Sequence, residues 1–193
     1  METYTRFEAV AGFGARRPYL TWGVFDGVHL GHQAILRSLV EWAVGRGGTP
    51  VAITFTDHPR QVLEHRRVSY LTTLGHRLRL LGRCGIEACL VLRFDLDFAA
   101  TSAEAFFRER LVGRLGVRGI VLGAGATFGH DREGNLERLR RWGADAGVEV
   151  RELAPVESPT GAISSTALRE AVEAGDLAAA ATMLGRTYSL LGT

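Results

Sequence analysis

The sequence predicts an α/β fold with a parallel, doubly wound sheet of about five strands and helices on both faces. Short runs rich in β-branched and aromatic residues alternate with helical repeats along the whole chain. The chain has 193 residues and 46% hydrophobic content, which is typical of a globular protein with a substantial core. Neither a low-complexity linker nor an internal repeat interrupts the alternation. We therefore expect one domain over residues 1–193.

The expected strands are short and mostly apolar. They cover Pro18–Phe25, Pro50–Phe55, Ile86–Phe94, Gly119–Gly123 and Val148–Leu153. Because a helical segment separates most of these strands from the next, they are expected to pair in parallel through right-handed crossovers.

The expected helices follow the strands and repeat apolar residues at helical spacing. They cover Ala34–Val44, Thr73–Gly82, Ala105–Val112 and Asn135–Ala146. Thr101 and Glu104 have the spacing of a capping box before the third of these helices. A last helical pattern contains Leu168 and Val172. In a sheet of this kind, ligands bind at the carboxyl ends of the strands.

The composition excludes several classes of function. A net charge of +2 is too small to indicate nucleic-acid binding. All 23 basic residues are arginine, so neither a phosphate-loop lysine nor a Schiff-base lysine is present. A phosphate bound here must therefore be met by arginine, histidine, backbone N–H groups or a metal ion.

The sequence also gives expectations about location and metal ligands. No apolar run is long enough to span a membrane, and Met1–Arg6 lacks the layout of a secretory signal, so we expect a cytoplasmic protein. Cys84 and Cys89 have no second pair with which to complete a zinc site, and we expect buried thiols. We assign no residue as a metal ligand.

The segment Gly23–Gln33 carries the strongest functional signal. It places His29 and His32 between a strand pattern and a helical pattern, among glycines that let a ligand approach the backbone. The N–H groups of the first helical turn would point at the same place, which favours an anion. This pattern indicates phosphate binding.

A second segment, Ile163–Arg169, places hydroxyl groups at the start of another helical pattern. One interpretation is that Ser164, Ser165 or Thr166 caps that helix. Another is that these hydroxyl groups and Arg169 bind a di- or triphosphate. Both interpretations can hold for different residues.

Together, Gly23–Gln33 and Ile163–Arg169 resemble the adenylyltransferase module of bacterial FAD synthetases, in the HxGH nucleotidyltransferase superfamily. Thr54–Pro59, Phe128 with Gly129, and Leu184–Tyr188 are similar to the module as well. The resemblance covers nearly the whole chain and implies a Rossmann-like sheet of the HxGH nucleotidyltransferase type. In that family a riboflavin kinase domain usually follows the module, so a chain that ends at residue 193 is expected to take FMN made elsewhere.

The resemblance implies an FMN adenylyltransferase, which transfers AMP from ATP to FMN and gives FAD and pyrophosphate without a covalent intermediate. Mg²⁺ would bridge the phosphates. His29 and His32 would act at the α-phosphate, and Arg169, with the hydroxyl groups beside it, at the departing phosphates. The expected catalytic residues are His29, His32 and Arg169. The residues expected to bind ATP or FMN are Gly23, Phe25, Asp26, Gly31, His58, Pro59, Gly123, Phe128, Ser164, Ser165 and Thr166.

Departures from the family pattern gather on the flavin side. Gly125 and Ala126 stand where the family usually has Asp or Asn followed by Phe, and Asp57 replaces a proline. Three alternatives therefore stay open: a nucleotidyltransferase with another phosphate-bearing acceptor, a non-catalytic nucleotide- or flavin-binding module, and a metal site at Asp26, His29 and His32. The sequence does not establish the identity of the acceptor, whether the nucleotide substrate is ATP or CTP, or the oligomeric state. We expect no nucleic-acid or membrane partner.

Overall fold

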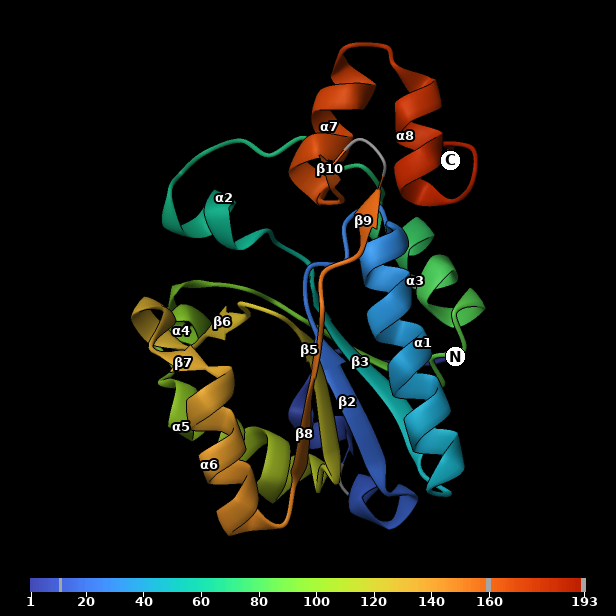
Figure 1. Ribbon diagram of the computed structural model, residues 1–193. Helices are drawn as coiled ribbons and strands as arrows, with labels where there is room; N and C mark the ends of the chain where they lie inside the picture. Colours follow the sequence, from blue (N-terminus) through green and yellow to red (C-terminus); the bar gives the residue numbers. More distant parts are fainter. Residues whose placement is uncertain (11, 159–160, 192–193) are drawn as a thin grey trace.

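A parallel sheet of six strands forms the centre of the protein (Figure 1), in a computed structural model that describes residues 1–10, 12–158 and 161–191. The strand order is β1-β4-β3-β2-β5-β8, and each neighbouring pair is parallel. The strands are β1 (Glu2–Tyr4), β2 (Pro18–Trp22), β3 (Thr49–Phe55), β4 (Ala88–Leu92), β5 (Gly119–Gly123) and β8 (Glu149–Leu153). The expected parallel α/β fold is confirmed.

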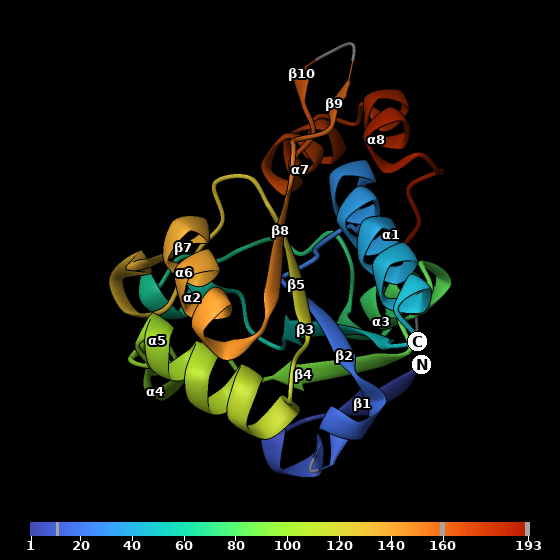
Figure 2. The same ribbon diagram turned by 60° about the horizontal axis from the view of Figure 1, so that its bottom comes forward.

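Helices cover both faces of the sheet, as the two views in Figures 1 and 2 show. One face carries α1 (Leu30–Gly45) and α3 (Leu74–Arg83), and the other carries a π-helix (Phe106–Leu115) and α6 (Leu136–Ala146). Shorter elements are α2 (Pro59–Leu63), α4 (Leu96–Ala99), α5 (Ala103–Ala105), and the strand pairs β6 (Thr127–Phe128) with β7 (Gly134–Asn135) and β9 (Glu157–Ser158) with β10 (Gly161–Ala162). Single-turn 3-10 helices lie at Phe7–Val10, Phe13–Arg16 and His130–Arg132.

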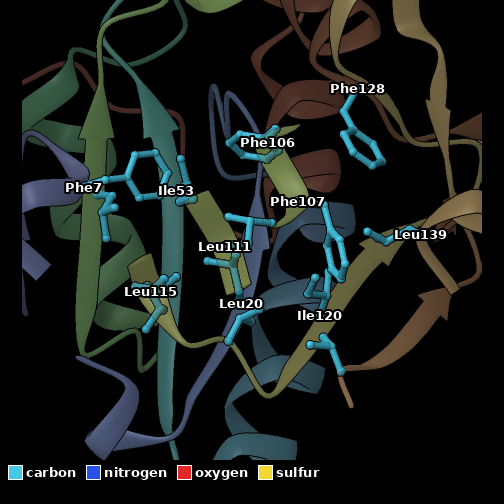
Figure 3. Close-up of a cluster of buried hydrophobic side chains, with 14 of the residues drawn as sticks. Phe7, Leu20, Ile53, Phe106, Phe107, Leu111, Leu115, Ile120, Phe128 and Leu139 are labelled. Carbon is cyan, nitrogen blue, oxygen red and sulfur yellow. The ribbon is translucent and has the colours of Figure 1, made fainter. Parts of the chain in front are cut away.

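Alternating side chains of the strands supply the two halves of the core. In β2, Tyr19 packs with Trp42 of α1, with ring centroids 4.8 Å apart, whereas Leu20 joins the cluster on the opposite face. Figure 3 shows that second cluster, to which Phe107 and Leu111 of the π-helix belong together with Leu20. Strands buried on both faces read as continuous apolar runs, which is why the sequence marked them clearly.

A third, smaller core lies beyond the carboxyl ends of the strands, where α7 (Ser165–Glu173) packs against α8 (Leu177–Leu184). Leu168, Met183 and Leu184 bury their side chains there together with Leu71 from the loop before α3. The last two helices are therefore attached to the edge of the sheet at which the strands have their carboxyl ends.

The structure corrects some local expectations. The sheet has six strands, because Glu2–Tyr4 adds β1 beside β4. The capping residue before α5 is Ser102, whose hydroxyl accepts from Ala105 N–H at 3.1 Å, and not Thr101. The helix expected over Ala105–Val112 is mostly a π-helix that runs to Leu115. Within the part of the chain that the structure describes, no helix has the length and apolar character needed to cross a bilayer.

Two helix-ending glycines allow a matched test of packing. Gly116 and Gly147 both have φ of +68°, which an alanine tolerates poorly, at about 1–2 kcal/mol. A Cβ on Gly116 would lie 2.7 Å from Gly14 Cα, whereas a Cβ on Gly147 would meet nothing within 4 Å. We expect Gly147→Ala to lower the unfolding free energy only by the roughly 1–2 kcal/mol of backbone strain. Gly116→Ala should lower it by about 1–3 kcal/mol more, because its Cβ also collides with Gly14. Chemical denaturation measures both, and equal losses would contradict the packing argument.

Candidate functional site

The loop between β2 and α1 has an unusual backbone. Phe25 and Val28 have φ of +52° and +42°, and Gly27 between them has +81°. Residues with side chains rarely adopt positive φ, and a β-branched residue such as Val28 does so least. Both side chains are buried, so the surrounding protein holds the loop in this conformation. The loop lies at the carboxyl end of a central strand, as the sequence predicted.

His29 and His32 lie face to face at the end of this loop. Their ring centroids are 3.7 Å apart and the ring planes differ by 18°. His29 is the N-cap of α1, since its Nδ1 accepts from the backbone N–H of His32 at 3.3 Å. The ring lies close over Gly31, where a Cβ would be only 3.2 Å from it, which explains the glycine at that position. Phe25 contacts His32 edge-on, with ring centroids 5.2 Å apart.

Both imidazoles are neutral in this arrangement. Burial lowers the pKa of His29 from 6.5 to about 4, although Asp26 acts in the opposite direction. Burial lowers the pKa of His32 well below its usual value too; His29, whose protonation would repel a second charge, and the guanidinium of Arg77 add to the effect. Because Nδ1 of His29 accepts a hydrogen bond, the proton of its neutral ring is on Nε2. His29 therefore offers an N–H donor on the side of the ring away from the helix cap.

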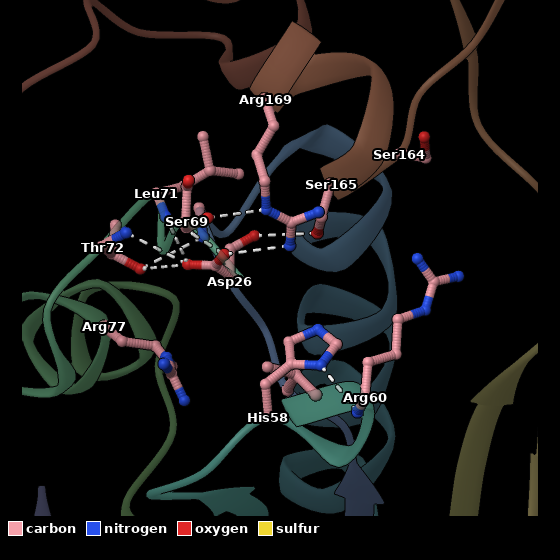
Figure 4. A network of polar contacts seen from close by, with 12 residues as sticks. Asp26, His58, Arg60, Ser69, Leu71, Thr72, Arg77, Ser164, Ser165 and Arg169 are labelled. Carbon is pink, nitrogen blue, oxygen red and sulfur yellow. Dashed lines mark hydrogen bonds and ion pairs between the residues drawn. The ribbon is translucent and has the colours of Figure 1, made fainter. Parts of the chain in front are cut away.

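The carboxylate of Asp26 holds several segments together (Figure 4). It accepts hydrogen bonds from the backbone N–H groups of Leu71 and Thr72 at 3.0–3.1 Å and from the Thr72 hydroxyl. It also pairs with Nη2 of Arg169 at 3.2 Å. Only 1% of Asp26 is exposed, so its charge depends on these partners.

The start of α7 is fixed against the same loop. Ser165 donates its hydroxyl hydrogen to Asp26 O at 3.0 Å, and Arg169 donates through Nε to Ser69 O at 2.8 Å. The Ser164 hydroxyl accepts from Ala167 N–H, which makes Ser164 the helix cap. Thr166 is exposed. The capping interpretation is therefore confirmed for Ser164, and the phosphate roles of Ser165, Thr166 and Arg169 stay predictions.

His58 and Pro59 begin a short helix beside the site. His58 caps α2 by accepting from Arg60 N–H at 3.2 Å, and Pro59 takes the first helical position, which suits its fixed φ. Burial, followed by the charge of Arg169, lowers the pKa of His58. His58 thus lies close enough to Arg169 for their charges to interact.

The other expected ligand-binding residues lie at the edge of the sheet or in the core. Gly23 directly follows β2, and Gly123 ends β5. Phe128 is buried and packs edge-on against Trp22, with ring centroids 5.1 Å apart. Gly125 has φ of +71° and open space where a side chain would lie, so this position offers only backbone groups.

Arg77 is the charged residue that the sequence did not reveal. It lies on α3 with 1% of its surface exposed, and its Nη1 donates to Phe55 O at 2.8 Å and to the Thr54 hydroxyl at 3.2 Å. Burial lowers its pKa. In the sequence Arg77 stands among the apolar residues of a helical pattern. An arginine exposed to solvent would fit that pattern equally well, so the sequence did not indicate its burial.

A metal site at Asp26, His29 and His32 is not supported. Among the described residues, no group of three or more His, Cys, Asp or Glu side chains could hold a metal ion. Asp26 faces Arg169 and backbone N–H groups, and Nδ1 of His29 caps a helix. Cys84 and Cys89 are free thiols, and burial raises the pKa of Cys89 to about 12.

Comparison with known proteins gives a consistent result. A family model described as FAD synthetase matches residues 14–167. The bifunctional riboflavin kinase/FMN adenylyltransferase of Escherichia coli (strain K12) is 34% identical over 174 residues, which are 90% of this chain and 56% of that protein. The protein of the same name from Listeria monocytogenes is 35% identical over 173 residues, 89% of this chain and 54% of that protein. The chain thus spans about half the length of the curated relatives it matches.

Solved structures support the fold. A structure described as a macrolide-efflux protein from Streptococcus pneumoniae has a TM-score of 0.84 and 27% identity, covering 97% of this chain and 62% of that one. A pantothenate synthetase from Thermus thermophilus has a TM-score of 0.52 and 18% identity, covering 93% and 79%. At 18% identity, the similarity to the pantothenate synthetase supports the fold alone.

The Asp26 network predicts an asymmetry between two ion pairs. Replacing Asp26 by alanine leaves Arg169 and two backbone N–H groups without their acceptor, so we expect the unfolding free energy to fall by about 3–5 kcal/mol. The matched control is Glu152→Ala, which removes an exposed ion pair with Arg140 at 2.8 Å. We expect this variant to change the unfolding free energy by less than about 1 kcal/mol. Similar losses in both variants would contradict the structural role of Asp26.

The neutral state of His29 predicts a dependence of stability on pH. Between pH 6.5 and about 4 the unfolded histidine is protonated and the folded one is not, so stability falls as the pH is lowered through this range. Over this whole range the lowered pKa of His29 reduces the unfolding free energy by about 3 kcal/mol. Unfolding of the wild type and of His29→Asn, measured from pH 7 to 4, should show a shallower slope in the variant. Equal slopes would mean that His29 takes up its proton at the same pH in the folded and the unfolded protein, and that burial does not lower its pKa.

Proposed function

Because this chain belongs to the FAD synthetase family, we propose that it transfers AMP from ATP to FMN, giving FAD and pyrophosphate. The observation that carries the proposal is the stacked pair of neutral histidines at the start of α1, with the start of α7 fixed beside it by Asp26. Two helix N-termini at one loop favour a bound polyphosphate. The proposed location is the cytoplasm, where ATP is made.

In the proposed reaction an oxygen of the FMN phosphate attacks the α-phosphorus of ATP. A new P–O bond forms, the bond to the β-phosphate breaks, and pyrophosphate leaves with the electron pair. The attacking oxygen is already anionic, so no side chain has to remove a proton. The protein needs to align two anions and stabilise the charge that grows on the transferred phosphate.

His29 and His32 are proposed to donate hydrogen bonds to the α-phosphate. Neutral rings suit this role, because an N–H donor that is already in position needs no change of protonation during the reaction. Arg169 is proposed to bind the departing β- and γ-phosphates and to stabilise their negative charge. Its contacts with Asp26 and Ser69 would keep the guanidinium in place before ATP binds.

Mg²⁺ is proposed to enter with ATP, bound to the phosphate oxygens. The donor set of the site fits a metal that is carried mainly by its substrate, since Mg²⁺ commonly binds proteins through few side chains and several waters. The residues around the histidine pair would then contact the phosphates, and the metal would neutralise part of their charge.

The acceptor side leaves room for a second candidate. Gly125 and Ala126 supply no polar side chain where the family usually has one, so a nucleotidyltransferase with another phosphate-bearing acceptor is the alternative. Identifying the reaction products distinguishes FMN adenylylation from this alternative. Incubated with ATP, Mg²⁺ and FMN, the purified chain should release pyrophosphate and FAD in equal amounts, and riboflavin should give neither. Pyrophosphate without FAD, formed only with a different phosphate acceptor, would support the alternative.

The histidine pair can be tested in the same assay. We expect His29→Asn and His32→Asn each to lower kcat by roughly a hundredfold or more, because a positioned donor to transition-state charge typically contributes about 3 kcal/mol. His65→Asn is the matched control on an exposed loop and should keep full activity. Thermal unfolding of the same samples shows whether each variant is folded. A folded His32→Asn protein with normal kcat would exclude the proposed mechanism.

A further inference from the structure

A cavity of about 240 Å³ lies next to the site but is lined by other residues. Its walls include Tyr70, Thr73 and Leu74 before and at the start of α3, His76 and Arg77 within that helix, and Leu190 from the C-terminal segment. The expected site residues do not line it. The volume is below the roughly 300–1,000 Å³ of typical pockets for drug-sized ligands, so a small ligand fits it best.

The buried charge of Arg77 is only partly compensated. Among the residues that the structure describes, Nε of Arg77 is buried without a hydrogen-bond acceptor. Its Nη1 donates only to uncharged oxygens, those of Thr54 and Phe55. Asp26 attracts this charge from a distance, but its carboxylate is paired with Arg169. A buried cation without an adjacent anion is unfavourable by several kcal/mol, and an anion in the cavity would relieve that.

The N-terminus of α3 lies at the same cavity, where Thr73 and Leu74 form part of the wall. Thr73 caps the helix, accepting from His76 N–H at 3.2 Å through its hydroxyl and from Arg77 N–H at 2.9 Å through its carbonyl. Within the described chain the N–H groups of Leu74 and Gly75 have no acceptor, as expected of a first helical turn. Nδ1 of His76 is likewise buried without a partner among these residues. The helix dipole places partial positive charge at this end.

We propose that this cavity is a binding site for a small anion of the phosphate class, inorganic phosphate or pyrophosphate, held by the Arg77 guanidinium and the first turn of α3. An oxyanion with several acceptor oxygens matches donors that come from a side chain and from a helix N-terminus. Neither His29 nor His32 lines the cavity, but two residues of its wall contact the loop that carries them. Leu71 and Thr72 line the cavity and also donate their N–H groups to Asp26.

Arg77 supplies a direct readout of binding. In the ¹⁵N-labelled full chain, its Nε–H gives a separate signal, identified as the one missing from Arg77→Lys or, if that variant does not fold, by through-bond assignment. The chain is titrated at constant ionic strength with inorganic phosphate and, in a second series, with pyrophosphate. We expect a saturable downfield shift of the Arg77 Nε–H signal, because this donor gains an acceptor on binding.

Two surface variants locate the anion. Leu190 is 77% exposed at the rim of the cavity, so Leu190→Glu adds a repelling carboxylate there without disturbing the core. We expect it to weaken binding at least tenfold. Leu177→Glu makes the same charge change on α8, outside the cavity lining, and should leave binding unchanged.

A further variant separates this site from the proposed active site. His32→Asn should keep the shift of the Arg77 signal, whether or not it retains activity, so failure of the proposed function and failure of this inference give different results. The inference is overturned if the Arg77 signal stays fixed up to about 10 mM phosphate and pyrophosphate, well above the millimolar Kd of a weak site. It is also overturned if Leu190→Glu and Leu177→Glu bind equally.

Discussion

The buried carboxylate of Asp26 is the interaction on which the arrangement of this site depends. It connects the loop after β2, the segment at Leu71 and Thr72, and the start of α7, which are far apart in the sequence. A charge in this position is stable only while all its partners are present. The strained backbone at Phe25 and Val28 is held in place by the same contacts, because the loop cannot relax without moving Asp26.

Electrostatics around the histidine pair follow from this arrangement. Arg77 and Arg169 bring positive charge to the edge of the sheet, and the only carboxylate buried among them is Asp26 in the described part of the chain. Burial lowers the pKa of both His29 and His32, and the positive charge of Arg77 lowers that of His32 further, whereas Asp26 partly offsets the effect at His29. A site built in this way is prepared for an anionic ligand, whose charge would complete the balance.

Much of the fold could be predicted from the sequence, because buried parallel strands such as β3 are continuous apolar runs between helices. β1 was missed because Glu2–Tyr4 is short and mostly polar at an edge of the sheet. In the site, local signals such as the glycines and histidines of one loop were readable. The pairing of Asp26 with Arg169 was not, since it joins residues 143 positions apart and depends on how α7 packs. Burial of Arg77 likewise depends on tertiary structure.

The double role of His29 has a consequence for the dynamics of α1. The lone pair on Nδ1 that caps the helix is also the position at which the ring would take up a proton. Protonation there would turn the acceptor into a donor facing the N–H of His32, so the cap would be lost and the first turn would fray. The rate of amide exchange at the start of α1 and the charge state of the His29 ring are therefore coupled through a single nitrogen atom. The helix terminus would order and disorder with the same midpoint at which the site changes charge.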